Sequence, residues 1–209
     1  MKTNRTTKKP SVASSLKKIE EAHPYKMILF LGMVGSSMIF LYTVLAYSAT
    51  HAALEASEFN IPKAFIVGSF ILVFSSFTIT PSLPGYQKED INRLKKSLHV
   101  TLVLGVAFMV CQVVGWKEML ALEEAMGSDS APTYLYILSA LHGVHFIAGI
   151  TFLAWLTHQW SRWINDPVKV LIAITNPFEK LKLEMLNIYW HFLDVVWILL
   201  FLFFLFFIY

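Results

Sequence analysis

The sequence predicts an all-α membrane protein, a polytopic bundle of five transmembrane helices with its N-terminus inside and its C-terminus outside. Three observations predict this fold class. Hydrophobic residues make up 56% of the 209 residues, and the mean hydropathy of +0.57 is too apolar for an ordinary soluble domain. The apolar residues form five blocks of about 20 residues or more, enough to cross the ~30 Å hydrocarbon core as helices. Basic residues gather in alternate connecting segments.

The apolar blocks define the expected spans and the domain organisation. We expect the five spans at residues 27–49, 64–82, 98–116, 133–157 and 186–208. The first block follows a polar tail and is longer than a typical signal-peptide core, so we expect it to stay as a membrane anchor. The chain therefore divides into a basic cytoplasmic tail over 1–24 and one membrane domain over 25–209. No soluble domain, nucleotide-binding loop or internal repeat is detected in the sequence.

The distribution of Lys and Arg gives the orientation. Of the 17 basic residues, seven lie in the tail up to Lys26, four between the second and third spans, and four between the fourth and fifth. Only Lys63 and Lys117 lie in the two opposite loops. Those loops carry acidic residues instead, namely Glu55, Glu58, Glu118, Glu123, Glu124 and Asp129. The positive-inside rule then places the N-terminus inside. The net charge of +3 therefore reflects topology, and no nucleic-acid partner is expected.

Small residues predict which faces of the spans look inward, because helices in lipid approach one another through small side chains. The predicted inward residues are Gly32, Gly35, Ser36 and Ser37 in the first span, Gly68, Ser75 and Ser76 in the second, and Gly105, Phe108, Gln112 and Gly115 in the third. The last segment, ILLFLFFLFFIY, has no polar face before Tyr209 and is expected to touch lipid or a large apolar partner. The single cysteine, Cys111, excludes a disulfide framework and indicates an apolar packing residue.

The fourth and fifth spans carry the polar groups that a lipid environment makes costly. Asn187, His191 and Asp194 form one stripe along the fifth span, because they are spaced at about one helical turn. The fourth span places Ser139, His142, His145 and Gly149 on one broad face. A charged Asp at mid-depth costs about 3 kcal/mol on insertion scales, so it needs a fixed partner. Since the two spans run in opposite directions, we predict a contact between His145 and Asp194.

Four interpretations of this polar cluster follow from the residues alone. Two histidines on facing helices could ligate one haem iron. His142 and His145 could form a metal site together with Asp194 or His191. The cluster could line a proton or substrate pathway. The fourth interpretation is a hydrogen-bond network that holds the helices together or binds lipid headgroups, and it is favoured because buried polar groups are usually paired with one another.

Two motifs make the sequence resemble a known family. The segment TYLYILSALHGVHFIAGI followed by YWHFLDVVWILLFLFFL resembles the last two helices of subunit III of haem–copper oxidases. That family shows a His-Gly-x-His helix and then a Trp-His-Phe-x-Asp-x-Val-Trp helix that ends at the outer face. TLVLGVAFMVCQVVGW and ILVFSSFTI resemble the two preceding helices. The resemblance covers residues 27–209, and the tail lies outside it.

The sequence departs from the family pattern in two respects. Larger members have seven spans, and this chain has five, as in the short bacterial form that lacks the first two. Many members carry a buried glutamate in the helix that corresponds to the first span here, and LFLGMVGSSMIF contains no acid. The glutamate that often follows the family's Gln is also missing, because Gln112 is followed by Val113, Val114, Gly115 and Trp116. A proton relay through those carboxylates is therefore not carried over.

The resemblance implies an indirect role in an oxidoreductase complex. In such oxidases haem and copper lie in subunits I and II, which reduce oxygen and pump protons, so this chain is expected to carry no cofactor, redox centre or catalytic residue of its own. Subunit III packs beside subunit I, holds phospholipids in a cleft and supports proton uptake. By motif match, the residues that build the network and shape the cleft are His142, His145, Trp190, His191, Asp194 and Trp197. Asn187 and Gln112, on the same polar faces, complete this predicted network.

The sequence therefore predicts a non-catalytic subunit III of a bacterial respiratory cytochrome c oxidase in the cytoplasmic membrane. Its expected partners are subunit I, subunit II, other subunits of a respiratory complex and phospholipids. Within the family, subunit III of a quinol oxidase or an accessory subunit of a nitric oxide reductase is the alternative. A stand-alone haem-binding membrane protein, using His142 or His145 with His191, is the alternative from another class. A transporter has less support, because no inverted repeat or pair of broken helices is visible.

Overall fold

The computed structural model of the chain describes residues 24–51, 62–126 and 131–208, and those residues form helices without a strand. The helices are α2 (Pro24–His51), α3 (Lys63–Ile79), α4 (Ser82–Gln87), α5 (Ile91–Met126), α6 (Ala131–Trp163), α7 (Pro167–Thr175) and α8 (Pro177–Ile208). The predicted tail over 1–24 lies outside the described residues, apart from Pro24, which begins α2. The all-α prediction is confirmed for the part of the chain described.

Five helices in these described ranges are long and apolar enough to cross a membrane. Each of the five expected spans falls on one of them, although the helices extend beyond the apolar blocks. The fifth helix begins at Pro177 rather than at residue 186, and the third begins at Ile91 rather than at residue 98. These extra turns contain charged residues. A hydropathy criterion does not count such residues as part of a membrane span, although the helix can continue through them.

Local sequence fixes where the last helices begin. Pro167 and Pro177 are the first residues of α7 and α8, a position at which proline loses no intrahelical hydrogen bond. The Asp166 side chain caps α7 by accepting from the backbone N–H of Val168, at 3.1 Å. The Asn176 side chain accepts from the N–H of Phe178 at 3.0 Å. The segments Asn165–Asp166–Pro167 and Asn176–Pro177 are typical of turns, and the sequence did not predict the short helix between them.

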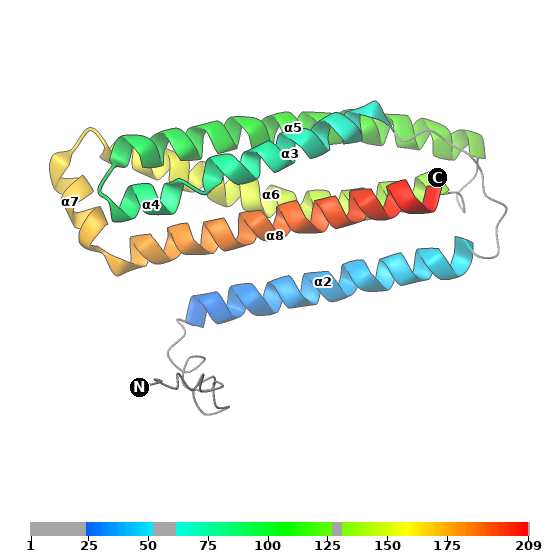
Figure 1. Cartoon of the computed structure of the whole chain (residues 1–209), viewed down its shortest axis with the longest axis horizontal. Helices are drawn as coiled ribbons and strands as arrows, with labels where there is room; N and C mark the ends of the chain where they lie inside the picture. Colours follow the sequence, from blue (N-terminus) through cyan, green and yellow to red (C-terminus); the bar gives the residue numbers. More distant parts are fainter. Residues whose placement is uncertain (1–23, 52–61, 127–130, 209) are drawn as a thin grey trace, which may run out of the picture.

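The helices pack in two unequal groups (Figure 1). Helices α3, α5, α6 and α8 pack side by side, with the most extensive contacts between α5 and its neighbours α3 and α6. Helix α2 lies outside α8 and contacts only α8 and α6 substantially. Its fully buried side chains in the described part are Phe40 and Tyr47. The bundle is therefore a four-helix core with a more loosely attached fifth helix.

The predicted inward faces are confirmed in the core, whereas in α2 the prediction is wrong for the two glycines and right for Ser36, which bonds His145 of α6. Gly105, Phe108, Gln112 and Gly115 are all buried along α5, as predicted. A Cβ at Gly115 would lie 2.4 Å from Phe65 Cε1, so the α3–α5 packing requires a glycine there. In α2, by contrast, Gly32 and Gly35 are exposed and have no packing atom within 4 Å of a Cβ position. The reason is that α2 turns Phe40 and Tyr47, not its glycines, toward the bundle.

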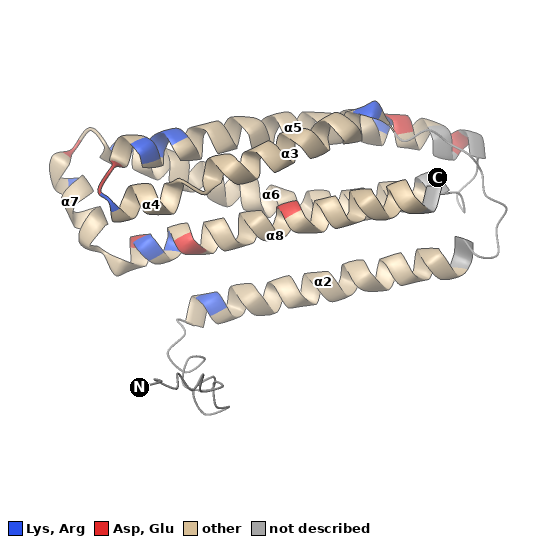
Figure 2. Ribbon diagram, viewed as in Figure 1, with Lys and Arg blue, Asp and Glu red and all other residues tan. Residues whose placement is uncertain are grey.

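Among the described residues, the basic residues that the sequence assigned to the inner side lie at one end of the bundle. The beginnings of α2, α5 and α8 meet at that end, where Lys and Arg are concentrated on all three helices (Figure 2). Lys63 and Lys117 lie near the opposite end, at the start of α3 and in the last third of α5. The structure thus separates the charges as the orientation prediction requires, and the direction across the membrane remains a prediction.

Candidate functional site

Four hydrogen bonds join α8 to the serines of α3 and α4. We call these serines, Ser69, Ser75, Ser76 and Ser82, the serine ladder. Two tryptophans of α8 donate through Nε1, Trp197 to Ser69 Oγ at 2.9 Å and Trp190 to Ser75 Oγ at 3.0 Å. His191 Nδ1 lies 2.8 Å from Ser76 Oγ. Asn187 Nδ2 donates to Ser82 Oγ at 2.8 Å. Because the two chain segments run in opposite directions, successive serines meet successive turns of α8. The polar stripe predicted on the fifth span therefore faces α3 and α4.

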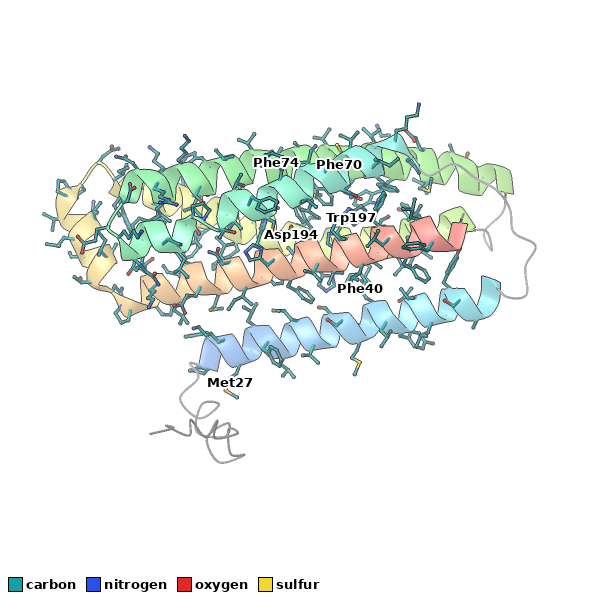
Figure 3. The ribbon with its side chains drawn as sticks, viewed as in Figure 1. Met27, Phe40, Phe70, Phe74, Asp194 and Trp197 are labelled. Carbon is teal, nitrogen blue, oxygen red and sulfur yellow. The ribbon has the colours of Figure 1, made fainter. Side chains whose placement is uncertain are left out.

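Asp194 lies within this contact region, with 6% of its surface exposed. Its Oδ2 lies 3.9 Å from Nδ1 of His191, one turn earlier on the same helix. Neither carboxylate oxygen has a hydrogen-bond partner among the described residues. Figure 3 shows Asp194 midway along α8, one turn before Trp197. The Asp194 carboxyl group thus lies beside the His191 imidazole and near the Ser76 hydroxyl, in the contact region between α3 and α8.

His142 is completely buried in a group of aromatic rings. Its ring centroid lies 5.1 Å from that of Trp197 and 6.1 Å from those of Phe108 and Phe146. Neither ring nitrogen has a hydrogen-bond partner among the residues that the structure describes. An imidazole packed in this way acts as an aromatic packing group that joins α5, α6 and α8.

His145 faces a different direction from His142 and connects α6 to α2. Its Nε2 lies 2.8 Å from Ser36 Oγ, and its Nδ1 lies 2.8 Å from the carbonyl oxygen of Leu141. The Tyr189 hydroxyl donates to the His145 carbonyl oxygen at 2.9 Å, which ties α8 to the same turn. The predicted contact between His145 and Asp194 was therefore wrong, because the helix rotation turns His145 toward α2 and leaves Asp194 on the face of α8 near α3.

Gln112 is fully buried on α5, and its amide group has no hydrogen-bond partner within the described ranges. One turn further along α5, Trp116 Nε1 donates to Ser139 Oγ on α6 at 3.0 Å. One turn earlier, Phe108 contacts the His142 ring. Gln112 thus lies between two α5 residues that contact α6, and no hydrogen bond within the described residues joins it to the predicted network.

The hydrogen-bond partners of the histidine ring nitrogens bear on the haem and metal interpretations of the site. Both ring nitrogens of His145 are engaged by Ser36 and Leu141, and Nδ1 of His191 is engaged by Ser76. Within residues 24–51, 62–126 and 131–208, no group of three His, Cys, Asp or Glu side chains is placed to hold a metal ion. What the arrangement does chemically is to join the five membrane-length helices and α4 through polar and aromatic contacts.

A second polar cluster lies at the end where the basic residues gather. The Lys182 ammonium lies 2.6 Å from the Glu179 carboxylate, and both side chains are at most one-tenth exposed. The same ammonium lies 4.8 Å above the Trp155 ring, a cation–π contact. Lys26 forms an ion pair with Glu184, which joins α2 to α8. These contacts hold α2, α6 and α8 together at the end of the bundle where the basic residues gather.

The Tyr86 side chain helps to attach helix α7 to this end. The Tyr86 hydroxyl lies 2.9–3.1 Å from the carbonyl oxygens of Ala173, Ile174 and Asn176, the last groups of α7 and its C-cap. At the other end of α7, a hydrogen bond from the Lys169 side chain and the backbone N–H groups of the first turn hold the pKa of Asp166 below its usual value. Both ends of α7 are thus fixed by named side chains.

Comparison with known proteins decides the family. A family model described as Cytochrome c oxidase subunit III matches residues 19–209. This chain belongs to that family. Cytochrome c oxidase subunit 3 of Synechocystis sp. is 28% identical over 189 residues, which cover 85% of this chain and 72% of the relative. Probable cytochrome c oxidase subunit 3 of Nocardia farcinica is 26% identical over 147 residues, which cover 70% and 67%.

Relatives within the subunit III family differ in their electron donor. Cytochrome bo(3) ubiquinol oxidase subunit 3 of Buchnera aphidicola is 26% identical over 180 residues, which cover 83% of this chain and 87% of the relative. The predicted resemblance is confirmed. The chain is a multi-pass membrane protein of the respiratory chain, its partners are the other subunits of an oxidase, and its family carries no metal centres.

The serine ladder was not predicted from the sequence of this subunit III family member. Ser75 and Ser76 are predicted only as small packing residues, and no prediction names Ser69 or Ser82. A spacing signal was present, since Ser69 and Ser75 are six residues apart and their partners Trp197 and Trp190 are seven residues apart. Both spacings are close to two helical turns, so two antiparallel helices can bring such groups together on facing surfaces.

Proposed function

We propose that this chain is the non-catalytic subunit III of a bacterial respiratory cytochrome c oxidase in the cytoplasmic membrane, where it stabilises the catalytic subunit. The match to the subunit III family over residues 19–209 carries this proposal. The similarity to relatives named as cytochrome c oxidase subunits supports cytochrome c as the donor. Subunit I is the proposed main partner, with subunit II and further subunits in the same complex.

The use of the polar side chains supports a structural role. Trp190, Trp197 and Asn187 donate to serines of neighbouring helices, and His145 bridges α6 and α2. A site for chemistry on a substrate needs donors and acceptors that are free to meet it, whereas these groups meet one another. The chain thus presents a fixed helical surface to its partners, and oxygen reduction takes place in the catalytic subunits.

Retention of phospholipid is the second part of the proposal. An open groove of about 300 Å³ runs between α2 and α8, and its walls are apolar apart from Ser37. Phe40 lies at this groove and points from α2 toward the core (Figure 3). Because the groove lies at the level of the hydrocarbon core, an acyl chain is the ligand that its surface fits. We assign the predicted lipid cleft to this space between the loosely attached helix and α8.

Assistance to proton uptake completes the proposed role, and it acts through packing. No acidic residue is present in α2, and Val113 follows Gln112 where relatives often carry an acid nearby. A carboxylate relay in those helices therefore has no residues to use. Retained lipid and rigid helix contacts would instead keep the surface of the catalytic subunit in its active arrangement during turnover.

Substitution of Asp194 tests the structural role. Asp194→Asn keeps the shape of the side chain and removes its charge next to His191, so we expect weaker assembly or faster loss of lipid. Initial oxygen reduction by the assembled complex should stay close to the wild-type rate. Immediate loss of oxygen reduction in a fully assembled mutant complex would show instead that Asp194 takes part in the reaction.

Purification of the native complex in a gentle detergent tests the identity of the partners. We expect this chain to copurify with an oxygen-reducing subunit, and a dinuclear copper motif in a neighbouring subunit would establish cytochrome c as the donor. A neighbouring subunit of the quinol oxidase type would establish quinol as the donor instead. Recovery without any oxygen-reducing subunit, together with a stoichiometric Soret band from the chain expressed alone, would support a separate haem-binding protein.

A further inference from the structure

A second open groove lies at the basic end of the bundle, away from the space between α2 and α8. Its volume is about 330 Å³, and residues at the end of α3, in the turn to α4 and in the first three turns of α5 line it. Phe77 and Val100 form its apolar part, and both are exposed, at 71% and 38% of their surface. Arg93 and Lys96 line the same groove. One concave surface thus combines an apolar wall with two cations.

The hydroxyl groups at the bottom of this groove are already used. Thr78 Oγ1 lies 2.8 Å from Thr101 Oγ1, and Ser97 Oγ donates to the Thr78 carbonyl oxygen at 2.5 Å. These bonds join α3 to α5 and give the groove a fixed floor. A ligand in the groove would therefore meet the two cations as its polar partners and the side chains of Phe77 and Val100 as its apolar partners.

Arg93 and Lys96 stand one turn apart on the first turns of α5, and both are exposed. In the part of the chain that the structure describes, no carboxylate lies within 4 Å of either charged group. The nearest acidic neighbour in sequence, Asp90, accepts a hydrogen bond from the backbone N–H of Arg93 at 3.0 Å. The electrostatic field at the mouth of the groove favours an anion.

Charge and shape together point to one occupant. A bilayer phospholipid presents a phosphate next to acyl chains, and basic pockets between transmembrane helices on the anionic side of a membrane bind such headgroups. A guanidinium group binds phosphate oxygens in a planar, often bidentate arrangement, and an ammonium group adds a second charge. The groove between α2 and α8 lacks a basic lining residue, so it does not share this preference for charge.

We propose that the groove formed by Phe77, Val100, Arg93 and Lys96 binds one phospholipid with a net negative headgroup. The phosphate lies between Arg93 and Lys96, and an acyl chain lies along Phe77 and Val100. This site is separate from the lipid groove of the proposed function, and neither depends on the other. It would anchor the beginning of α5 in the membrane surface at the end where the basic residues gather.

Lipid binding to the purified complex tests the proposal. The complex is reconstituted in bilayers of phosphatidylcholine with a small fraction of phosphatidylglycerol, and bound lipids are counted by native mass spectrometry. We expect Arg93→Gln/Lys96→Gln to lower the affinity for phosphatidylglycerol about thirtyfold, as expected for two surface cations. Lys88→Gln/Lys95→Gln is the matched control, because it removes the same charge from the same region but from residues that do not line the groove.

A third variant separates binding of the lipid from simple attraction of phosphate. Val100→Trp keeps both cations and fills the apolar part of the groove, so we expect it also to lose the tightly held phosphatidylglycerol. Full retention in this variant would mean that only the phosphate is recognised and would overturn the proposed lipid site. Equal loss in both charge variants, or release of a neighbouring subunit in place of a lipid, would also overturn it. Loss confined to the two groove variants would establish it.

Discussion

The hydrogen bond between Trp190 and Ser75 provides the sharpest test of the serine ladder. Both residues are completely buried, and the Nε1–Oγ distance is 3.0 Å. Ser75→Ala removes the acceptor and leaves the indole N–H without a partner in an apolar interface. In water-soluble proteins a buried donor without a partner costs about 1–3 kcal/mol. Polar pairs measured in a membrane protein average about 0.6 kcal/mol and reach about 1.7 kcal/mol. Full burial and good geometry place this pair near the upper value.

A double-mutant cycle isolates that contribution. Ser75→Ala, Trp190→Phe and the double variant are compared with the wild type by unfolding of this chain in the purified complex with increasing SDS. We expect a coupling free energy of about 1–1.7 kcal/mol. In Ser75→Ala the indole N–H of Trp190 is buried without an acceptor, and in the double variant Trp190→Phe has removed that N–H, so the second substitution costs less. Thr151→Val is the control, since its exposed hydroxyl bonds only the Ile147 carbonyl of its own helix, at 2.7 Å.

The same cycle can contradict the reasoning. Free energies that add to within about 0.3 kcal/mol would show that the hydrogen bond contributes nothing beyond packing. A control variant as damaging as Ser75→Ala would show that any lost helix hydroxyl weakens the chain. In either case the serines would act only as small residues that allow close helix approach, and their hydrogen bonds to α8 would contribute no stability.

Two further predictions concern packing and pH. Gly115→Ala, whose Cβ would lie 2.4 Å from the Phe65 ring, should destabilise the complex by about 1–3 kcal/mol in a thermal unfolding assay, whereas Gly32→Ala, with nothing within 4 Å, should be neutral. The lowered pKa of Asp166 means that its cap stabilises α7 above its unfolded pKa and is lost as pH falls through the folded value. Amide exchange of Lys169, corrected for intrinsic rates, should therefore lose protection on acidification, and Asp166→Asn, which caps without titrating, should remove that dependence.

Much of the fold could be predicted from sequence because lipid imposes strong local rules. Every backbone polar group must be paired within the membrane, so a long apolar block has to be a helix. That rule located all five membrane-length helices, although charged extensions such as the first turns of α8 were missed. Helix α7 was missed for a related reason. It is short, and its ends are fixed by Asp166 and by a distant tyrosine, Tyr86, whose role no local pattern reveals.

The structure shows contacts within the candidate site that the sequence did not predict. His145 bonds Ser36 on α2 rather than approaching Asp194. A stripe on a helical wheel gives the direction of a side chain relative to its own helix, and it leaves the rotation of the neighbouring helix undefined. A rotation of a few tens of degrees is enough to exchange one partner for another.

The sequence by itself determined the membrane class, the number of spans, the separation of charge and the family motifs. Each of these properties sums over residues or depends on neighbours within a few turns, so it can be evaluated without knowing which helices meet. Only the tertiary structure decided that serines of α3 accept hydrogen bonds from the tryptophans of α8, and that α2 packs loosely with its glycines exposed. Those outcomes depend on the fit of whole helix surfaces, where a single close contact, such as Gly115 against Phe65, selects one packing over another.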